Sequence, residues 1–476
     1  MGLKWWIGPS GKTSTHAVVL GRLIVAGEDH GIHGVVVQLR DGGHMPMPGV
    51  TIGDCGPKGG QNGLDNGFLH FDGVRVPVDR LLNRFGDVVD GRYVAVEPSE
   101  SRRFGATMGE LSSGRVHFGN TAVVTLFSAV TIALRYSAVR HQFGPTGRKG
   151  EPEWPIFEFQ LHRARLVPIL AAGLALRAFT HEVTDDFVRL ALAKRHGHVD
   201  AALGAEMHAL TAGSKAYGTW TAFAATQQAR ECCGGHGISG FSRLAQLRAD
   251  IDPSLTYEGD NNVMMQQVAR FIVMAHGRGS GDKYRTLGYL ALVGDAEARA
   301  ARAWQWTSSD DLERVLSLRA ASLLETSFGP RSSGERSWND SQVHALQPLA
   351  VAHMELAIFR AFRRSAARHA TTDGQRALER FLHLFGVHVL VRDAAVLLEA
   401  GITDADGSRG LKDAFRSLLE TSKDDVLGMV DAVAPPDHVL CSVLGASDGR
   451  VFTRYLAAVR AAPGVHSRAS WWPSKL

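Results

Sequence analysis

The hydrophobic pattern of this chain changes its period near Ser101, and the change limits the folds open to it. Before this point, residues 17–27 and 33–40 are rich in Val, Ile and Leu and are bounded by Gly and Asp, as β-strands are. Residues 67–77 alternate more clearly and contain an Asp-Gly turn. After it, residues 115–140 are apolar nearly all round, which indicates a helix packed inside a bundle. We therefore expect a small β domain followed by helices.

Further helical runs fill the rest of the chain, and one small polar segment divides them. Residues 276–283, HGRGSGDK, have the composition of a linker between domains. The expected fold class is multi-domain α+β, with a small antiparallel β domain followed by two mainly α-helical bundles. The expected parts are the β domain at residues 1–92, a first helical bundle at 93–277, a linker at 278–283, a second helical bundle at 284–473 and a targeting tail at 474–476.

Length and composition narrow the class of protein. A chain of 476 residues is too long for one ordinary core. A hydrophobic fraction of 45% and a charged fraction of 21% are those of a soluble globular protein, and a net charge of +4 does not call for a nucleic-acid partner. No uncharged apolar run is long enough to span a membrane. The four cysteines form no CxxC pair and the 21 histidines form no HExxH motif, so we expect a reducing compartment and no metal site.

The last three residues match a targeting signal. Ser474, Lys475 and Leu476 form the tripeptide that the peroxisomal import receptor reads at a C-terminus. Three specified residues at one fixed position argue against coincidence, and the preceding GVHSRASWWP has the loose composition of an exposed tail. We expect the protein to be peroxisomal.

Glu258 is the first candidate for chemistry. It lies in LTYEGDNNVMMQQVARFIV, between Tyr257 and Gly259, just before an apolar helical pattern that Asp260, Asn261 or Asn262 could cap. A carboxylate beside a helix N-terminus complements the helix dipole, and the pattern alone favours this structural role. The alternative is a partly desolvated general base, which the apolar and aromatic neighbours of Glu258 would permit.

A glycine-rich stretch, CCGGHGISGFS, is the second candidate. Gly235, Gly237 and Gly240 match a dinucleotide fingerprint nominally, but that motif needs a preceding strand. A helical pattern precedes it here, so a glycine turn between helices, which a cofactor can approach closely, fits better.

Two further stretches could meet a planar ring or a diphosphate. KWWIGPSGKTS places Trp6 beside Gly8, which suits either an edge strand or the floor of a ring-binding site. YSAVRHQFG places Arg140, Gln142 and Phe143 at the end of a helix. Arginine is common there, and a guanidinium beside an amide and a ring also suits a pyrophosphate or a flavin edge.

These motifs occur together in one known family. KWWIG, LRYSAVRHQFG, ECCGGHG and TYEGDNNVMMQQVARF, in this order and at these spacings, resemble the acyl-CoA oxidases of peroxisomes, which are relatives of the acyl-CoA dehydrogenases. The resemblance continues through MHALTAGSKAYGTWTA and CSVLGASDGRVF and covers nearly the whole chain from Lys4.

The resemblance implies a flavoenzyme of fatty acid β-oxidation. It implies that Glu258 removes the α-proton of a fatty acyl-CoA while FAD takes a hydride from the β-carbon, giving a trans-2-enoyl-CoA. Reoxidation of the flavin by O2 would release hydrogen peroxide. It further implies a homodimer, with FAD contacts from both subunits and Arg115 near the substrate. The implied cofactor-binding residues are Trp6, Gly8, Arg140, Gln142, Phe143, Gly235 and Asn262.

The chain departs from the family pattern at its start. The family carries a helical domain and flavin-contacting strands before the KWW motif, whereas Met1, Gly2 and Leu3 stand immediately before it here. We therefore expect a fragment or an N-terminally shortened protein. Two alternatives stay open, an acyl-CoA dehydrogenase that uses another electron acceptor and a non-catalytic acyl-CoA-binding or partner subunit.

Overall fold

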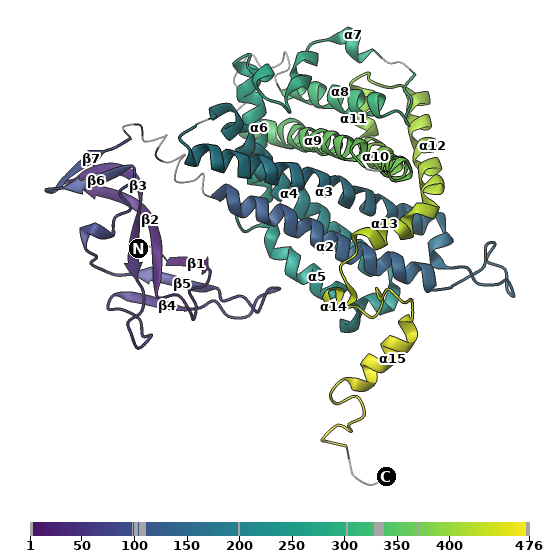
Figure 1. Cartoon of the computed structure of the whole chain (residues 1–476), viewed down its shortest axis with the longest axis horizontal. Coiled ribbons are helices and arrows are strands. Elements are labelled where there is room, and N and C mark those ends of the chain that lie inside the picture. Colours follow the sequence, from purple (N-terminus) through teal and green to yellow (C-terminus); the bar gives the residue numbers. More distant parts are fainter. Residues whose placement is uncertain are drawn as a thin grey trace. The chain divides into compact units, whose positions relative to one another are not determined.

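The chain folds into two compact units, Met1–Ser112 and Ser113–Leu476, in a computed structural model (Figure 1). The structure describes residues 3–97, 99, 103, 111–198, 200–300, 303–327, 338–369 and 371–472. The tail residues Ser474, Lys475 and Leu476 lie outside the described residues.

The first unit is an antiparallel β domain, as the sequence predicts. One sheet has the strand order β1-β5-β4, and β2-β3 and β6-β7 form two hairpins. The β2-β3 hairpin turns at Ala26 and Gly27, which both have positive φ, the geometry of a tight hairpin turn. Leu39, Val50 and Leu69 form a small core. The strands are β1 (Leu3–Ile7), β2 (His16–Val25), β3 (Glu28–Gln38), β4 (Val50–Asp54), β5 (Gly67–Phe71), β6 (Gly86–Val89) and β7 (Arg92–Ala95).

The second unit is helical and begins within α2. The helices are α2 (Leu111–Val139), α3 (Gln160–Arg195), α4 (Ala201–Cys232), α5 (Leu244–Ile251), α6 (Asn261–Gly277), α7 (Ala296–Arg299), α8 (Ser309–Ser327), α9 (Gln347–Ala367), α10 (Thr372–Arg392), α11 (Ala394–Glu399), α12 (Ala405–Thr421), α13 (Val426–Val433), α14 (Asp437–Leu440) and α15 (Val451–Ala461). Helix α4 packs on α3, α6 and α9, and α9 packs in turn on α8 and α10 (Figure 1). The predicted boundary at residues 278–283 falls inside this unit, just after α6 ends.

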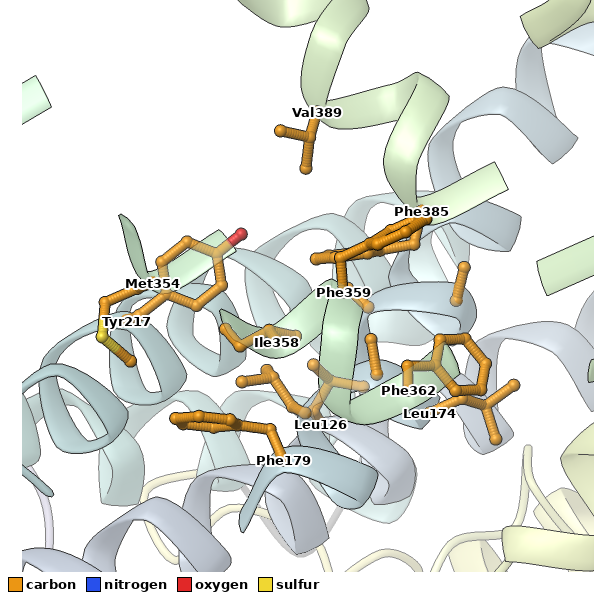
Figure 2. Close-up of a cluster of buried hydrophobic side chains, with 14 of the residues drawn as sticks. Leu126, Leu174, Phe179, Tyr217, Met354, Ile358, Phe359, Phe362, Phe385 and Val389 are labelled. Carbon is orange, nitrogen blue, oxygen red and sulfur yellow. The ribbon is translucent and has the colours of Figure 1, made fainter. Parts of the chain in front are cut away.

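One continuous apolar core serves the helices on both sides of that boundary. Figure 2 shows Leu126, Leu174 and Phe179 from the early helices packed with Ile358, Phe359 and Phe385 from the later ones. Burial of such side chains stabilises a fold by about 1.5–3 kcal/mol each. The early helices, which carry Arg115 and flank the turn of Glu258, are therefore held in place by the later ones.

Helices α2 and α3 are long and apolar enough, by length and composition, to cross a membrane. In each, 72% of the most apolar window is buried inside the protein, as in the central helices of a bundle. The sequence-based expectation that no uncharged apolar run is long enough was therefore wrong as to length and composition, because residues 116–134 carry no Asp, Glu, Lys or Arg.

A buried ionic network fastens α4, α8, α9 and α10 together. Glu355 is fully buried and accepts from Arg319 at 2.7 Å and from Arg392 at 2.6 Å. Arg319 also pairs with Asp393 at 2.7 Å. The hydroxyl of Tyr217 donates to Glu355 at 3.0 Å, and burial together with that carboxylate raises the pKa of Tyr217. Such a network specifies one arrangement of the helices because a lone charge in the core is costly.

Replacing Arg319 by Met should therefore destabilise the protein. Arg319→Met leaves the Glu355 and Asp393 carboxylates with Arg392 alone, and we expect a loss of about 3–5 kcal/mol in the free energy of unfolding. Urea unfolding measures it. The control is Arg376→Met, whose exposed pair with Asp373 should contribute less than about 1 kcal/mol. Equal losses in the two variants would contradict this account of the core.

Candidate active site

Glu258 lies on a turn with an unfavourable backbone conformation. The turn follows a short 3-10 helix, Asp252–Leu255, and ends at Asp260, whose carboxylate caps α6 by accepting from the amides of Asn262 and Val263. Glu258 has φ +55° and Gly259 has φ +107°. A left-handed conformation costs a non-glycine residue about 1–2 kcal/mol and persists only where neighbouring groups enforce it.

The carboxylate of Glu258 rests on the first turns of α2. A Cβ atom placed on Gly114 would lie 3.0 Å from Oε2 and 3.1 Å from Cδ of Glu258. Gly114 therefore provides the space that the carboxylate occupies. The side chain of Glu258 is nevertheless exposed, so a ligand can reach it.

Arg115, the next residue on α2, brings a buried cation to the turn. Its Nε lies 3.5 Å from the carbonyl oxygen of Glu258. Burial lowers the pKa of Arg115, and the negative charge of Glu258 opposes that shift. Among the described residues, no hydrogen-bond acceptor meets the buried Nη1 of Arg115. A buried donor without a partner is costly, so this atom is suited to meet a ligand oxygen or a water molecule.

Lys215 of α4 holds the other end of the turn. Its ammonium is fully buried and donates to the carbonyl of Gly259 at 2.7 Å and to Oδ1 of Asn261 at 2.8 Å. Burial lowers the pKa of Lys215 to about 8, and the carboxylates of Asp260 and Glu258 oppose that shift. Buried cations therefore meet the carbonyl oxygens of both left-handed residues.

Aromatic rings line the same place. The rings of Tyr257 and Phe118 lie 4.5 Å apart, and His117 packs edge-on against Phe118 at 5.3 Å. His208 of α4 is close to Arg115, and burial together with that cation lowers the pKa of His208. The exposed carboxylate is thus bordered by apolar surface as well as by cations.

Asn262 belongs to this group and not to the glycine-rich turn. It is exposed on the first turn of α6, and its Oδ1 accepts from Nε2 of Gln347 at 3.1 Å. This contact joins α6 to the start of α9.

Arg140, Gln142, Phe143 and Gly235 form a second group. After α2, the backbone amide of Gln142 donates to Trp154 and that of Trp154 donates to Phe143, which makes a short ladder. Phe143 has φ +60° and its ring is 65% exposed. A Cβ atom on Gly235 would meet no atom within 4 Å, so the surface there is open.

Two aromatic residues join these two loops. The hydroxyl of Tyr136 lies 3.4 Å from Nδ1 of His236, which brings the end of α2 to the glycine-rich turn. Arg140 is close enough for its charge to oppose the rise in the pKa of Tyr136 that burial causes. The ring of His236 also packs against Tyr455 of α15, at 5.1 Å.

The two groups lie far apart along α4. Lys215 marks the Glu258 group, and Cys232 ends the helix just before the glycine-rich turn. At 1.5 Å per residue, this length of helix spans about 25 Å. The structure therefore brings together Glu258, Arg115 and Asn262, and separately Arg140, Gln142, Phe143 and Gly235.

Trp6 and Gly8 belong to the first unit. Trp5 packs on Phe68 with ring centroids 5.1 Å apart, whereas Trp6 has φ +64° and is 62% exposed. Gly8 follows at the exposed turn after β1. An exposed indole beside a glycine is compatible with a planar ligand.

The sequence assigned no role to Lys215 or Gly114 and suggested Asn261 only as a helix cap. One signal was present, since Lys215 stands alone as a charge within TAGSKAYGTW, on a helix that is otherwise small and apolar there. Gly114 gave no signal, because its role depends on a carboxylate more than 140 residues later in the chain.

Comparisons with known proteins find similar sequences and folds over nearly the whole chain. Residues 108–273 match the family model described as acyl-CoA oxidase, C-alpha1 domain, and residues 299–476 match the model described as acyl-CoA oxidase. The human protein named peroxisomal acyl-coenzyme A oxidase 3 is 40% identical over 494 residues, which cover 99% of this chain and 70% of that protein.

Two solved structures are similar throughout. Acyl-CoA oxidase-1 of Caenorhabditis elegans, crystallised in complex with FAD and ATP, has a TM-score of 0.86 and 30% identity, over 98% of this chain and 69% of that one. Acyl-CoA oxidase 1 of Arabidopsis thaliana has a TM-score of 0.88 and 32% identity, over 98% of this chain and 72% of that one.

The buried ammonium of Lys215 should make the free energy of unfolding depend on pH. The folded protein releases this proton near pH 8, whereas the unfolded chain keeps it to about pH 10.5. Between these values the unfolded chain binds more protons, so the Lys215 contribution to stability rises with pH. Relative to Lys215→Met, the wild type should gain up to about 3 kcal/mol between pH 7.5 and 10.5. Urea unfolding across this range measures the difference, and a difference that does not change with pH would refute the burial of a charge at this position.

Proposed function

The chain belongs to the acyl-CoA oxidase family, and we propose that it oxidises the Cα–Cβ bond of a fatty acyl-CoA with FAD, giving a trans-2-enoyl-CoA. The observation that carries the proposal is the exposed carboxylate of Glu258, held on a left-handed turn between two buried cations. It is an acyl-CoA oxidase of peroxisomal fatty acid β-oxidation, like the relatives it matches.

Glu258 is the proposed base. An α-proton of a thioester is weakly acidic, so its removal needs a carboxylate fixed within hydrogen-bond distance of it. The turn directs the oxygens of Glu258 over Gly114, and Arg115 and Lys215 contact the backbone carbonyls of Glu258 and Gly259. The proton moves to a carboxylate oxygen of Glu258.

Arg115 is the proposed substrate-binding residue. Its buried Nη1 meets no acceptor among the described residues, and an oxygen of the acyl-CoA would satisfy it. Tyr257 and Phe118 supply apolar surface that excludes water from the α-carbon.

The second group and the exposed residues of the β domain each have, by themselves, the chemistry of an FAD contact. The open surface at Gly235 lets a cofactor backbone approach, the exposed ring of Phe143 can stack, and Arg140 supplies a cation for the diphosphate. Trp6 and Gly8 present an exposed ring and an exposed turn, and Asn262 would contribute from the first turn of α6. When bound, FAD supplies the acceptor for the β-hydride.

A homodimer explains the separation of the two groups. About 25 Å of α4 lies between Lys215 and the glycine-rich turn, which is far for one reacting centre. We propose that Arg140, Gln142, Phe143 and Gly235 complete the FAD site of a partner subunit. We also propose O2 as the electron acceptor, with release of hydrogen peroxide, and Ser474-Lys475-Leu476 as the ligand of the peroxisomal import receptor.

Replacing Glu258 by Gln tests the base. We expect Glu258→Gln to keep its bound flavin and to lose at least about a thousandfold in the rate at which a saturated acyl-CoA bleaches the flavin, because an amide cannot take the proton. Stopped-flow absorbance without oxygen measures that rate, and peroxide release in air measures turnover. The control is Asp252→Asn, which removes an exposed carboxylate from the same segment. A Glu258→Gln variant that still makes peroxide would contradict the assignment, and a wild type that binds no flavin would contradict the proposed function.

Gly114 offers a test that leaves the base itself intact. Gly114→Ala puts a methyl group about 3 Å from the Glu258 carboxyl and should displace it, lowering kcat by about tenfold to a hundredfold. The control is Gly218→Ala on α4, where the new methyl group would meet Ala122 at an ordinary 3.5 Å. The proposal that Gly114 makes room for the base fails if both variants keep full activity.

A further inference from the structure

We infer that Lys215 is a positioning residue for Glu258, which holds the turn 258–261 in the conformation that presents the carboxylate. The inference rests on the proposed function, in which Glu258 removes the α-proton. Lys215 belongs to α4 and Glu258 to the segment before α6, so the contact joins two elements that are more than 40 residues apart in the chain.

The hydrogen bonds around Lys215 form a closed ring. Its ammonium donates to Oδ1 of Asn261, whose Nδ2 donates to the hydroxyl of Thr219 at 2.9 Å. That hydroxyl donates to the backbone carbonyl of Lys215 at 2.8 Å, one helical turn earlier. Lys215, Asn261 and Thr219 are all buried, so each fixes the other two. The ring leaves Lys215 one orientation, in which it also holds the carbonyl of Gly259.

The turn needs such a hydrogen bond to keep its conformation. Glu258 and Gly259 are consecutive left-handed residues, and a glutamate does not adopt this conformation unaided. Arg115 reaches the Glu258 carbonyl only at 3.5 Å, whereas Lys215 reaches the Gly259 carbonyl at 2.7 Å. Lys215 therefore makes the stronger hydrogen bond to this pair of peptides.

The charged groups that act on Lys215 come from the turn and from α2. Asp260 and Glu258 from the turn attract its proton, Arg115 from α2 repels it, and the ring of Tyr257 lies 6.0 Å away. A methionine of similar length would satisfy the packing without the cost of burying a cation. The chain keeps a buried ammonium where it fixes the carbonyl of Gly259, next to Glu258.

The test compares Lys215→Met with Thr226→Val in the full-length protein. Thr226 is fully buried on the same helix and its hydroxyl donates within α4, to Phe223, so its loss disturbs α4 without touching the turn. The first readout is amide hydrogen exchange of a peptide spanning residues 255–265. We expect at least about tenfold faster exchange in Lys215→Met and no change in Thr226→Val, because only the first frees the turn.

The second readout is the rate of flavin reduction by acyl-CoA, counted per bound flavin, with a substrate deuterated at the α-carbon for comparison. In Lys215→Met we expect the rate to fall at least about tenfold, the KM to change less than about threefold and the α-deuterium isotope effect to grow, because proton removal becomes slower. Loss of folded protein alone would lower the number of bound flavins without changing the rate per flavin or the isotope effect.

Each outcome decides the inference. Unchanged exchange of the turn in Lys215→Met, or an unchanged rate per flavin, overturns it. Should Lys215→Met fail to fold, Thr219→Val keeps the ammonium and breaks only the ring, and we expect the same changes at about twofold to fivefold. If wild-type protein does not reduce flavin with any acyl-CoA, the proposed function fails, and the exchange readout still decides whether Lys215 holds the turn.

Discussion

Lys215 donates from inside the helical core to the carbonyl of Gly259, and two residues later Tyr217 donates to Glu355 in the ionic network of α8, α9 and α10. Residues two apart on a helix point in nearly opposite directions, so α4 is fixed on both sides. On one side it holds the turn that carries Glu258, and on the other it is held by the later helices. The position of the proposed base therefore depends on packing between the two predicted bundles.

Three of the residues proposed to bind or react have a strained backbone. Glu258, Phe143 and Trp6 are all left-handed although none is a glycine. Such residues recur at ligand and catalytic sites, because a strained turn presents a side chain that a regular element would bury or direct elsewhere. Glu258 shows the consequence most clearly, since its carboxylate stays exposed while its peptide lies between buried cations. The rest of the helical unit provides the rigidity that keeps this turn in place.

The sequence predicted the order of β domain and helices because hydrophobic period is a local property that residues 17–40 and 115–140 display openly. Glu258 was different, since its pattern alone favoured a helix-dipole role, and only the resemblance to a family made it a base. The roles of Lys215 and Gly114 were not predicted, because they arise from contacts between segments far apart in the chain. No local sequence pattern shows that a lysine on α4 will donate to the carbonyl of Gly259, which lies just before α6.

The central claim is that Glu258, held in this turn, removes the α-proton of an acyl-CoA. An acyl-CoA with sulfur in place of its β-carbon has no β-hydride to lose, so proton removal can be observed alone. Incubated with the flavin-bound protein in D2O, this compound should exchange its α-protons at least about a hundredfold faster than in buffer, as measured by NMR. Glu258→Gln should abolish the acceleration. Exchange at the wild-type rate in Glu258→Gln would contradict the account.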